Sequence, residues 1–289
     1  MIYLSPEHRS ALGEDTFWTW FQREFRGSAF GMPDPPQADD VILRYSTLGA
    51  SPYPERTVAL LWELHPEMKS RLLSSAWDGI IEKINACART SRFRVVSCSI
   101  MLPYYDAFGA SDVLPIGVDT NLFRPMDKAA LRRKHGIPVD RPVGFWCGTT
   151  HPMKGFDNLV TWRRSHPDVH FIIVWKNREG SARSEGVHSY VRVSQAKLAE
   201  LMNCADFYLS CGRLRPFFMV EWEAMACNLP MVVIAGEPKE FAPSANPRDD
   251  VFARGWDRKS AKTSWERFLK RTIREISSAN PNSNLETAQ

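Results

Sequence analysis

The sequence predicts an α/β protein with two Rossmann-like, doubly wound domains, and three observations lead to this fold class. Continuous apolar runs such as Val41–Leu43 and Val58–Trp62 are typical of strands buried on both faces of a parallel sheet. Segments with apolar residues at helical spacing alternate with such runs in both halves of the chain, as in doubly wound folds. The length of 289 residues corresponds to two domains at roughly 150 residues per domain.

The first half is expected to contain four strands and two helices. Phe17, Phe21 and Phe25 recur at helical spacing, and Asp15 or Thr16 is expected to cap this helix. A loop is expected at 31–36, where glycine and prolines exclude regular structure. The expected strands are Ile2–Leu4, Val41–Leu43, Val58–Trp62 and Phe93–Ser97, and the expected helices are Asp15–Phe25 and Pro66–Arg89.

The second half alternates more regularly between strands and helices. The expected strands are Val143–Cys147, Val169–Trp175, Asp206–Ser210 and Met231–Ile234, and the expected helices are Phe156–Arg164, Gln195–Asn203 and Phe218–Cys227. Ser194 is expected to cap the helix that follows it. The last helix, Lys259–Ile276, is basic and amphipathic, with Trp265 and Phe268 on its apolar face. We expect domains at 1–118 and 119–258, and a segment 259–289 whose helix packs back on the first domain.

The composition is that of a globular protein and excludes a disordered chain, because 44% of the residues are hydrophobic and 24% are charged. The six cysteines include no C-x-x-C pair, so we expect reduced core cysteines in a cytoplasmic protein and no disulfide framework or cysteine zinc site. Neither a signal peptide nor a membrane span is expected. The net charge of +4 permits an anionic partner without requiring one.

The loops that follow strands of the second half carry the candidate binding residues. Ligands of open α/β sheets bind beyond the carboxyl ends of the strands, beside helix N-termini that favour phosphates. In Cys147–Asp157, glycines, hydroxyls and Lys154 lie between a strand and a helix, so Lys154 is either a phosphate contact or a solvated turn residue. The spacing of a P-loop is absent. In Ser210–Phe218, two arginines precede a helix start and can clamp an anion.

Two acidic residues and one histidine complete the candidates. Glu223 lies within about two turns of its helix start, where its carboxylate can accept hydrogen bonds from sugar hydroxyls. Glu221 projects to a different face, and balancing the helix dipole is its simpler explanation. His65 closes an apolar strand of the first half, a usual place for a cleft residue, although a lone histidine is as readily structural.

Five stretches of the second half follow one another in the order of a known set of motifs. Val113–Pro125 resembles IPNGVDxxxFxP, Leu131–Pro138 matches LRxxxGIP, Gly148–Asp157 resembles GRxxxxKGxD, Leu198–Asp206 resembles LAxLYxxAD, and Glu223–Val233 is close to EAMACGTPVV. In this order they resemble the large retaining, nucleotide-sugar-dependent family of GT-B glycosyltransferases (group 1 type), with a compact phage-type member as one candidate. The resemblance implies a GT-B fold, with two domains facing a cleft. The first 110 residues match only in pattern.

The resemblance also implies roles for single residues. Lys154 would contact the donor diphosphate and Glu223 the nucleotide ribose, while His65 would orient the sugar or the acceptor. Two positions depart from the family: Arg215 stands in place of a glutamate that contacts the transferred sugar, and Thr149 in place of a loop arginine. Arg215 or Arg213 would restore the positive charge that Thr149 does not supply. The implied donor-binding residues are Gly148, Thr149, Lys154, Arg213, Arg215, Phe217, Phe218 and Glu223, and the implied catalytic residues are His65, Lys154 and Arg215.

The resemblance therefore implies transfer of a sugar from a nucleotide-diphosphate donor to a hydroxyl acceptor, with retention and with neither a metal nor a cofactor. The absence of an Asp-x-Asp motif fits this expectation. The acceptor is either a glycan or small molecule, or a hydroxymethylated base in DNA. The net positive charge, the basic last helix and Trp18, Trp20, Arg23 and Arg26 favour DNA. The alternative is an inactive relative that binds a nucleotide sugar or a nucleic acid, for which Arg215 is the best support.

Overall fold

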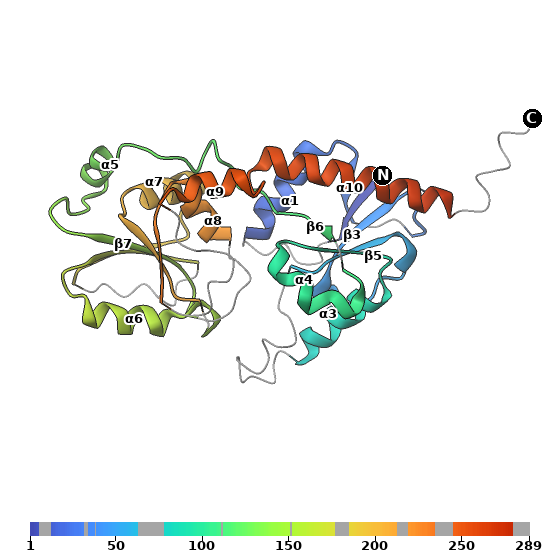
Figure 1. Cartoon of the computed structure of the whole chain (residues 1–289), viewed down its shortest axis with the longest axis horizontal. Helices are drawn as coiled ribbons and strands as arrows, with labels where there is room; N and C mark the ends of the chain where they lie inside the picture. Colours follow the sequence, from blue (N-terminus) through green and yellow to red (C-terminus); the bar gives the residue numbers. More distant parts are fainter. Residues whose placement is uncertain are drawn as a thin grey trace, which may run out of the picture. The chain divides into compact units, whose positions relative to one another are not determined.

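The computed structural model describes residues 1–5, 13–31, 34–37, 39–62, 78–110, 112–150, 152–176, 185–212, 219–234 and 245–279. The chain divides into two compact units: unit 1 contains Met1–Ile116 and Lys259–Gln289, and unit 2 contains Gly117–Arg258. Each unit has a parallel β-sheet with helices against it (Figure 1). The prediction of an α/β fold with two Rossmann-like units is therefore confirmed.

In unit 1, six described strands form a parallel sheet in the order β2-β1-β3-β4-β5-β6. The strands are β1 (Ile2–Ser5), β2 (Ser28–Phe30), β3 (Val41–Tyr45), β4 (Thr57–Leu60), β5 (Phe93–Val96) and β6 (Asp112–Val113), and the α-helices are α1 (Gly13–Glu24), α3 (Asp78–Thr90) and α4 (Leu102–Tyr105). Every residue of β3 and β4 is buried, as their continuous apolar runs predict.

In unit 2, five described strands form a parallel sheet in the order β11-β10-β7-β8-β9. The strands are β7 (Val143–Gly148), β8 (His170–Trp175), β9 (Val187–Val191), β10 (Phe207–Ser210) and β11 (Met231–Val233), and the α-helices are α5 (Lys128–His135), α6 (Phe156–Ser165), α7 (Gln195–Asn203), α8 (Met219–Ala226) and α9 (Pro247–Ala253). The strand order reverses between β7 and β10, since β8 and β9 continue on one side of β7 and β10 and β11 lie on the other. Ligands of open α/β sheets bind beyond the carboxyl ends of strands at such a switch point.

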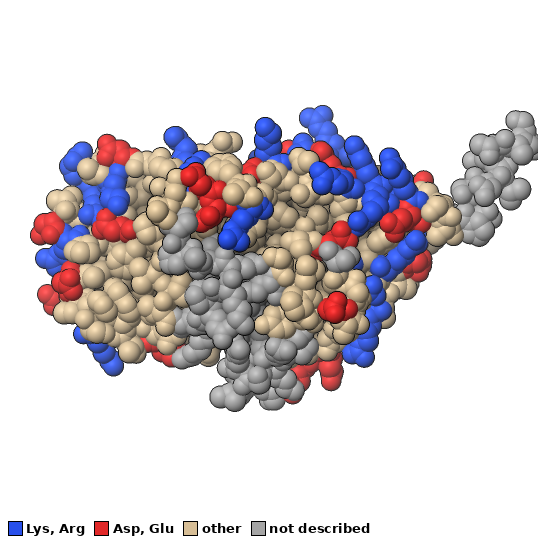
Figure 2. Space-filling model, viewed as in Figure 1, with Lys and Arg blue, Asp and Glu red and all other residues tan. Residues whose placement is uncertain are grey.

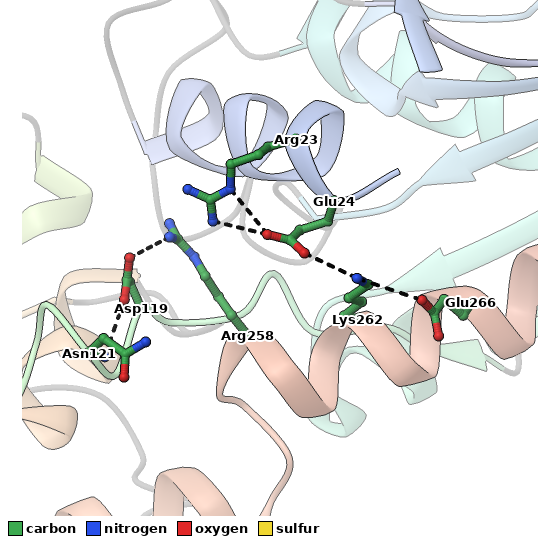
Figure 3. A network of polar contacts seen from close by, with 7 residues as sticks. All are labelled: Arg23, Glu24, Asp119, Asn121, Arg258, Lys262 and Glu266. Carbon is green, nitrogen blue, oxygen red and sulfur yellow. Dashed lines mark hydrogen bonds and ion pairs between the residues drawn. The ribbon is translucent and has the colours of Figure 1, made fainter. Parts of the chain in front are cut away.

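The long helix α10 (Arg258–Ser278) packs on the aromatic core of unit 1. Its fully buried Trp265 contacts the rings of Phe21 and Trp62, and its indole Nε1 donates to the carbonyl of Pro115 at 3.2 Å. At the helix surface, Lys262 binds the carboxylate of Glu24 of α1 at 3.2 Å (Figure 3). This helix therefore completes the core of the unit that contains the N-terminus.

Most expected elements of the described residues are present. Besides β2 and β9, the structure adds β6, α4, α5 and α9, which were not expected, and one helix begins elsewhere than expected. Helix α1 begins at Gly13, so the expectation that Asp15 or Thr16 caps it is wrong: both lie inside the helix. The edge strands β2 and β9 were not expected, because their residues are only half buried and carry no continuous apolar run. The expected cap at Ser194 is confirmed, since its hydroxyl accepts a hydrogen bond from the Lys197 amide at 3.2 Å.

The six cysteines are all buried and free, as predicted. None of the helices in the described part of the chain combines the length and apolar character needed to cross a membrane. The described residues also contain no cluster of three or more His, Cys, Asp or Glu side chains that could hold a metal ion.

Candidate donor-binding site

The candidate site lies at the switch point of unit 2, where the loop after β7 meets the end of β10. Gly155 ends this loop and caps α6 in the left-handed conformation, with a φ of 64°. A Cβ atom at Gly155 would overlap the carbonyl oxygen of Cys211, the residue that follows β10. The Asn158 side-chain amide donates to the same carbonyl at 3.2 Å. This close approach holds the preceding residue, Lys154, beside the switch point.

Glu223 occupies the second turn of α8, and its side chain is buried. The residue is 6% exposed, and no hydrogen bond joins its carboxylate to any described residue. Burial raises the pKa of the Glu223 carboxyl from 4.5 to about 7, against the lowering effects of Lys176 and then of Arg258. A buried carboxylate that accepts no hydrogen bond from the described residues is well suited to accept hydrogen bonds from ligand hydroxyls.

Lys176 directly follows β8 and lies next to the end of β7. The β7–β8 register pairs Gly148 with Trp175 and Cys147 with Val174, and the Lys176 amide donates to the Gly148 carbonyl at 3.0 Å. Side chains alternate between the two faces of a strand, so Lys176 falls on the sheet face that carries Cys147.

The charged groups of the site gather around the Cys147 thiol. Burial raises the pKa of this thiol to about 12, Lys176 and Lys154 act to lower it, and Glu223 acts to raise it. One thiol thus lies within electrostatic range of all three side chains. Two lysines and one buried carboxylate therefore lie near the carboxyl end of β7.

Arg258 brings a further positive charge from a distant part of the sequence. Val118 pairs with Asp257 in an isolated parallel bridge, which places Arg258 beside the segment that opens unit 2. Its guanidinium donates to the Asp119 carboxylate at 2.6 Å, and the same carboxylate accepts from the Asn121 amide at 3.2 Å (Figure 3). The motif aspartate at position 119 therefore has a structural role, because it anchors Arg258.

Glu221 is separate from this group and joins α8 to the sheet. It is buried in the first turn of α8, and its carboxylate accepts a hydrogen bond from the Ser210 hydroxyl of β10 at 2.5 Å. The structure therefore supports the interpretation of Glu221 as a structural residue. In addition to its position near the positive end of the helix dipole, Glu221 is hydrogen-bonded to β10.

Sequence comparison finds relatives for part of the chain. No protein-family model matches it. The D-inositol 3-phosphate glycosyltransferase of Segniliparus rotundus is 30% identical over 150 residues, which cover 45% of this chain and 33% of that protein. The chain thus spans about a third of the length of the curated relatives that it matches.

Comparison with solved structures extends over both units. WaaG, a glycosyltransferase involved in lipopolysaccharide biosynthesis, matches with a TM-score of 0.62 at 13% identity, over 99% of this chain and 98% of that chain. The chain has the GT-B fold. HepE of Anabaena, crystallised with UDP-glucose, matches with a TM-score of 0.58 at 15% identity, over 96% of this chain and 97% of that chain. These matches, at 13% and 15% identity, show the fold alone, and it is the fold that the resemblance implies.

The GT-B fold brings part of the predicted site together. Gly148 and Lys154 lie side by side, because a Cβ atom at Gly148 would be 3.4 Å from the Lys154 Cβ. Thr149 follows Gly148 in the same loop, and Glu223 shares the surroundings of Cys147 with Lys154. The other predicted site residues lie outside the described residues: His65, Arg213, Arg215, Phe217 and Phe218.

Unit 2 also contains two charged residues near the site that were not predicted from the sequence, Lys176 and Arg258. Lys176 could have been found, because it is the first residue after the strand expected at Val169–Trp175, and strand ends are where such sheets bind ligands. Arg258 had no such signal, since its place depends on a bridge between positions 118 and 257.

Asn228 stands where the family motif has glycine, and it keeps the left-handed backbone conformation, with a φ of 61°.

Proposed function

We propose that the chain is a glycosyltransferase that moves a sugar from a nucleotide-diphosphate sugar to a hydroxyl acceptor. The observation that carries the proposal is the buried Glu223 carboxylate, without a hydrogen bond to described residues, beside Lys154 and Lys176 at the switch point. Such a group matches a ligand with both sugar hydroxyls and phosphates. The GT-B fold and the partial similarity to named glycosyltransferases point to the same ligand class.

In this proposal each residue contributes to binding or to departure of the nucleotide. The Glu223 carboxylate accepts hydrogen bonds from ribose hydroxyls, and the Lys154 ammonium stabilises the charge that develops on the leaving diphosphate. Gly148 and Thr149 line the loop between β7 and α6. By resemblance to the family, Arg213, Arg215, Phe217 and Phe218 complete the donor site and His65 orients the sugar or the acceptor.

Retention of configuration and independence from metals and cofactors are parts of the same proposal and rest on the family resemblance. The cationic side chains at the switch point supply positive charge that a metal ion provides in other glycosyltransferases.

Nucleoside diphosphates test the proposal directly. We expect UDP, GDP or ADP to raise the unfolding temperature, because a ligand at 100 times its Kd stabilises a protein by about 2.7 kcal/mol. Lys154→Ala should weaken this stabilisation, whereas Lys134→Ala should not, since Lys134 pairs with Glu200 on the surface. UDP-glucose should also be hydrolysed slowly without an acceptor. If no nucleoside diphosphate shifts the unfolding temperature and UDP-glucose is not hydrolysed, the proposed glycosyltransferase activity is contradicted.

The alternative of an inactive relative predicts a different combination of results. Arg215 replaces the family's sugar-contacting glutamate, which favours binding without transfer. An inactive relative would be stabilised by nucleoside diphosphates and would leave every nucleotide sugar intact. Hydrolysis of any nucleotide sugar by the wild-type chain, lost in Lys154→Ala, would exclude it.

The acceptor is a glycan or small molecule, or a hydroxymethylated base in DNA. Trp18 and Trp20 do not support DNA, because they are 4% and 3% exposed and belong to the aromatic core. Arg23 is paired with the neighbouring Glu24 at 3.1 Å. The support for DNA that remains is helix α10, which has seven basic and two acidic side chains in a chain of net charge +4. Lys and Arg side chains gather over this helix in Figure 2.

The exposed face of α10 provides a test for a DNA acceptor. Arg267, Lys270 and Arg274 are exposed and form no ion pair with any described residue. We expect duplex DNA to bind at low salt, and the triple variant R267S/K270S/R274S to bind more weakly. The slope of log affinity against log salt should fall by about 2.7 in magnitude, because each lost phosphate contact contributes about 0.9. Fluorescence anisotropy measures both quantities, and lack of binding by the wild-type chain at low salt would exclude DNA.

A further inference from the structure

The loop after β7 has one positive charge fewer than the motif that it resembles, because Thr149 stands in place of an arginine. A diphosphate carries charge on two phosphoryl groups, and Lys154 by itself is a single point charge. We infer that Lys176 is a donor-binding residue that contacts the diphosphate beside Lys154, and that together with Arg213 or Arg215 it supplies the positive charge that Thr149 lacks. This inference rests on the proposed function and deepens it.

The backbone geometry places Lys176 at the carboxyl edge of the unit 2 sheet, on the face that carries Cys147. It is the first residue after β8, and its amide is bound to the Gly148 carbonyl at 3.0 Å, where the Gly148–Lys154 loop begins. Alternation along β8 puts its side chain on the Cys147 face, away from the core cluster that contains Trp175. Lys154 approaches the same strand end from the loop after β7. The charges of both lysines act to lower the pKa of the Cys147 thiol.

The Lys176 ammonium is available for a ligand. The side chain is half buried, and no carboxylate or carbonyl of the described residues forms a hydrogen bond or ion pair with it. Two other basic side chains of unit 2 have a carboxylate partner, since Lys128 and Arg132 bind Asp206 at 2.8 Å and 2.6 Å. A partly buried ammonium that has no close counter-ion among the described residues, and that lies near a second lysine, suits an anionic ligand better than it suits packing.

Lys176 also affects Glu223, which gives the inference a second readout. The titratable or charged groups around Glu223 in the described residues are Lys176, Arg258, Cys147, Tyr208 and Cys227. The two thiols have pKa values raised to about 12, and the pKa of Tyr208 is raised well above 10, by burial in all three cases. Glu223, with a pKa of about 7, therefore titrates near neutral pH, whereas the two thiols and Tyr208 do not. Removal of Lys176 should raise the pKa of Glu223 further.

The experiment measures the binding of UDP and of uridine to the full chain by calorimetry between pH 6 and 9. Four proteins are compared: wild type, Lys176→Ala, Lys176→Arg and the surface control Lys134→Ala. We expect Lys176→Ala to weaken UDP binding by about 10- to 100-fold, the range for a lost charge-assisted hydrogen bond, and to leave uridine binding unchanged at the high-pH end of the range, where the Glu223 carboxyl is ionised. The pH midpoint of UDP binding should move upward in Lys176→Ala and return toward the wild-type value in Lys176→Arg.

The outcomes separate this inference from the proposed function. Equal UDP affinity and an equal pH midpoint in wild type and Lys176→Ala would overturn the role of Lys176 and leave the donor site intact. Equal losses of UDP and uridine binding would also overturn it, because they would indicate a general structural effect. If the wild-type chain binds neither UDP nor GDP nor ADP, the proposed function fails, and the role of Lys176 fails with it.

Discussion

Replacing Glu223 with glutamine is expected to remove about 3 kcal/mol of pH-dependent destabilisation between pH 4.5 and 8. The carboxyl is buried, and its pKa in the folded chain is raised from 4.5 to about 7. Below pH 4.5 the group is protonated in both states. Between the two values the unfolded state ionises while the folded state stays protonated, so stability falls as the pH rises. Above pH 7 this loss of unfolding free energy is complete, and it amounts to about 1.36 kcal/mol for each unit by which the pKa is raised.

Urea unfolding of wild type and Glu223→Gln at several pH values checks this expectation. The difference between the two proteins isolates Glu223, because every other titrating group is common to both. Glu200→Gln is the matched control of opposite sign: a hydrogen bond from Lys134 chiefly lowers the pKa of Glu200, so its stabilising effect is lost as the pH falls. A difference between wild type and Glu223→Gln that stays constant from pH 4.5 to 8 would contradict the buried, raised carboxyl.

A glutamate that destabilises the fold at neutral pH needs a compensating role. Its position in α8 offers none within the described residues, since its carboxylate forms no hydrogen bond there, unlike the neighbouring Glu221, which binds Ser210. Functional sites are where proteins keep such costs. Glu223→Gln should therefore weaken UDP binding as well, because the amide replaces one acceptor oxygen by a donor nitrogen. Loss of affinity together with flatter pH dependence would identify Glu223 as a ligand contact.

The sequence predicted the sheet of unit 2 well because its central strands are buried on both faces. Strands β7, β8 and β10 are continuous apolar runs, and the helices between them show regular spacing. Edge strand β9 was missed, because its mixed polar and apolar residues are all half buried and resemble a loop. The tryptophans of α1 were open to two interpretations, since periodicity alone does not distinguish a core face from a binding face.

The site was predictable to the extent that it depends on local sequence. Lys154 and Glu223 lie in motifs, so their positions beside a strand end and in a helix follow from nearby residues. Their proximity to each other depends on the switch from β7 to β10, which only the strand order reveals. Arg258 depends on still longer-range structure, the bridge between Val118 and Asp257. Contacts across such distances in sequence leave no spacing pattern that could be read.

Replacing Gly155 with alanine is expected to cost about 3 kcal/mol of unfolding free energy. Two physical effects add. A φ of 64° costs a residue with a Cβ about 1–2 kcal/mol, and the new methyl group would overlap the Cys211 carbonyl, which forces the loop and β10 apart at an overpacking cost of about 1–3 kcal/mol.

Gly136→Ala is the control that separates these two effects. Gly136 ends α5 in unit 2 with a nearly identical φ of 65°, and a Cβ atom there would meet nothing within 4 Å. The Gly136→Ala variant should lose about 1 kcal/mol of unfolding free energy, from the conformational effect alone. Urea unfolding gives both values, and equal losses in the two variants would show that the contact between Gly155 and Cys211 does not constrain the loop. If the contact is real, only Gly155→Ala displaces Lys154, so only that variant should bind UDP more weakly.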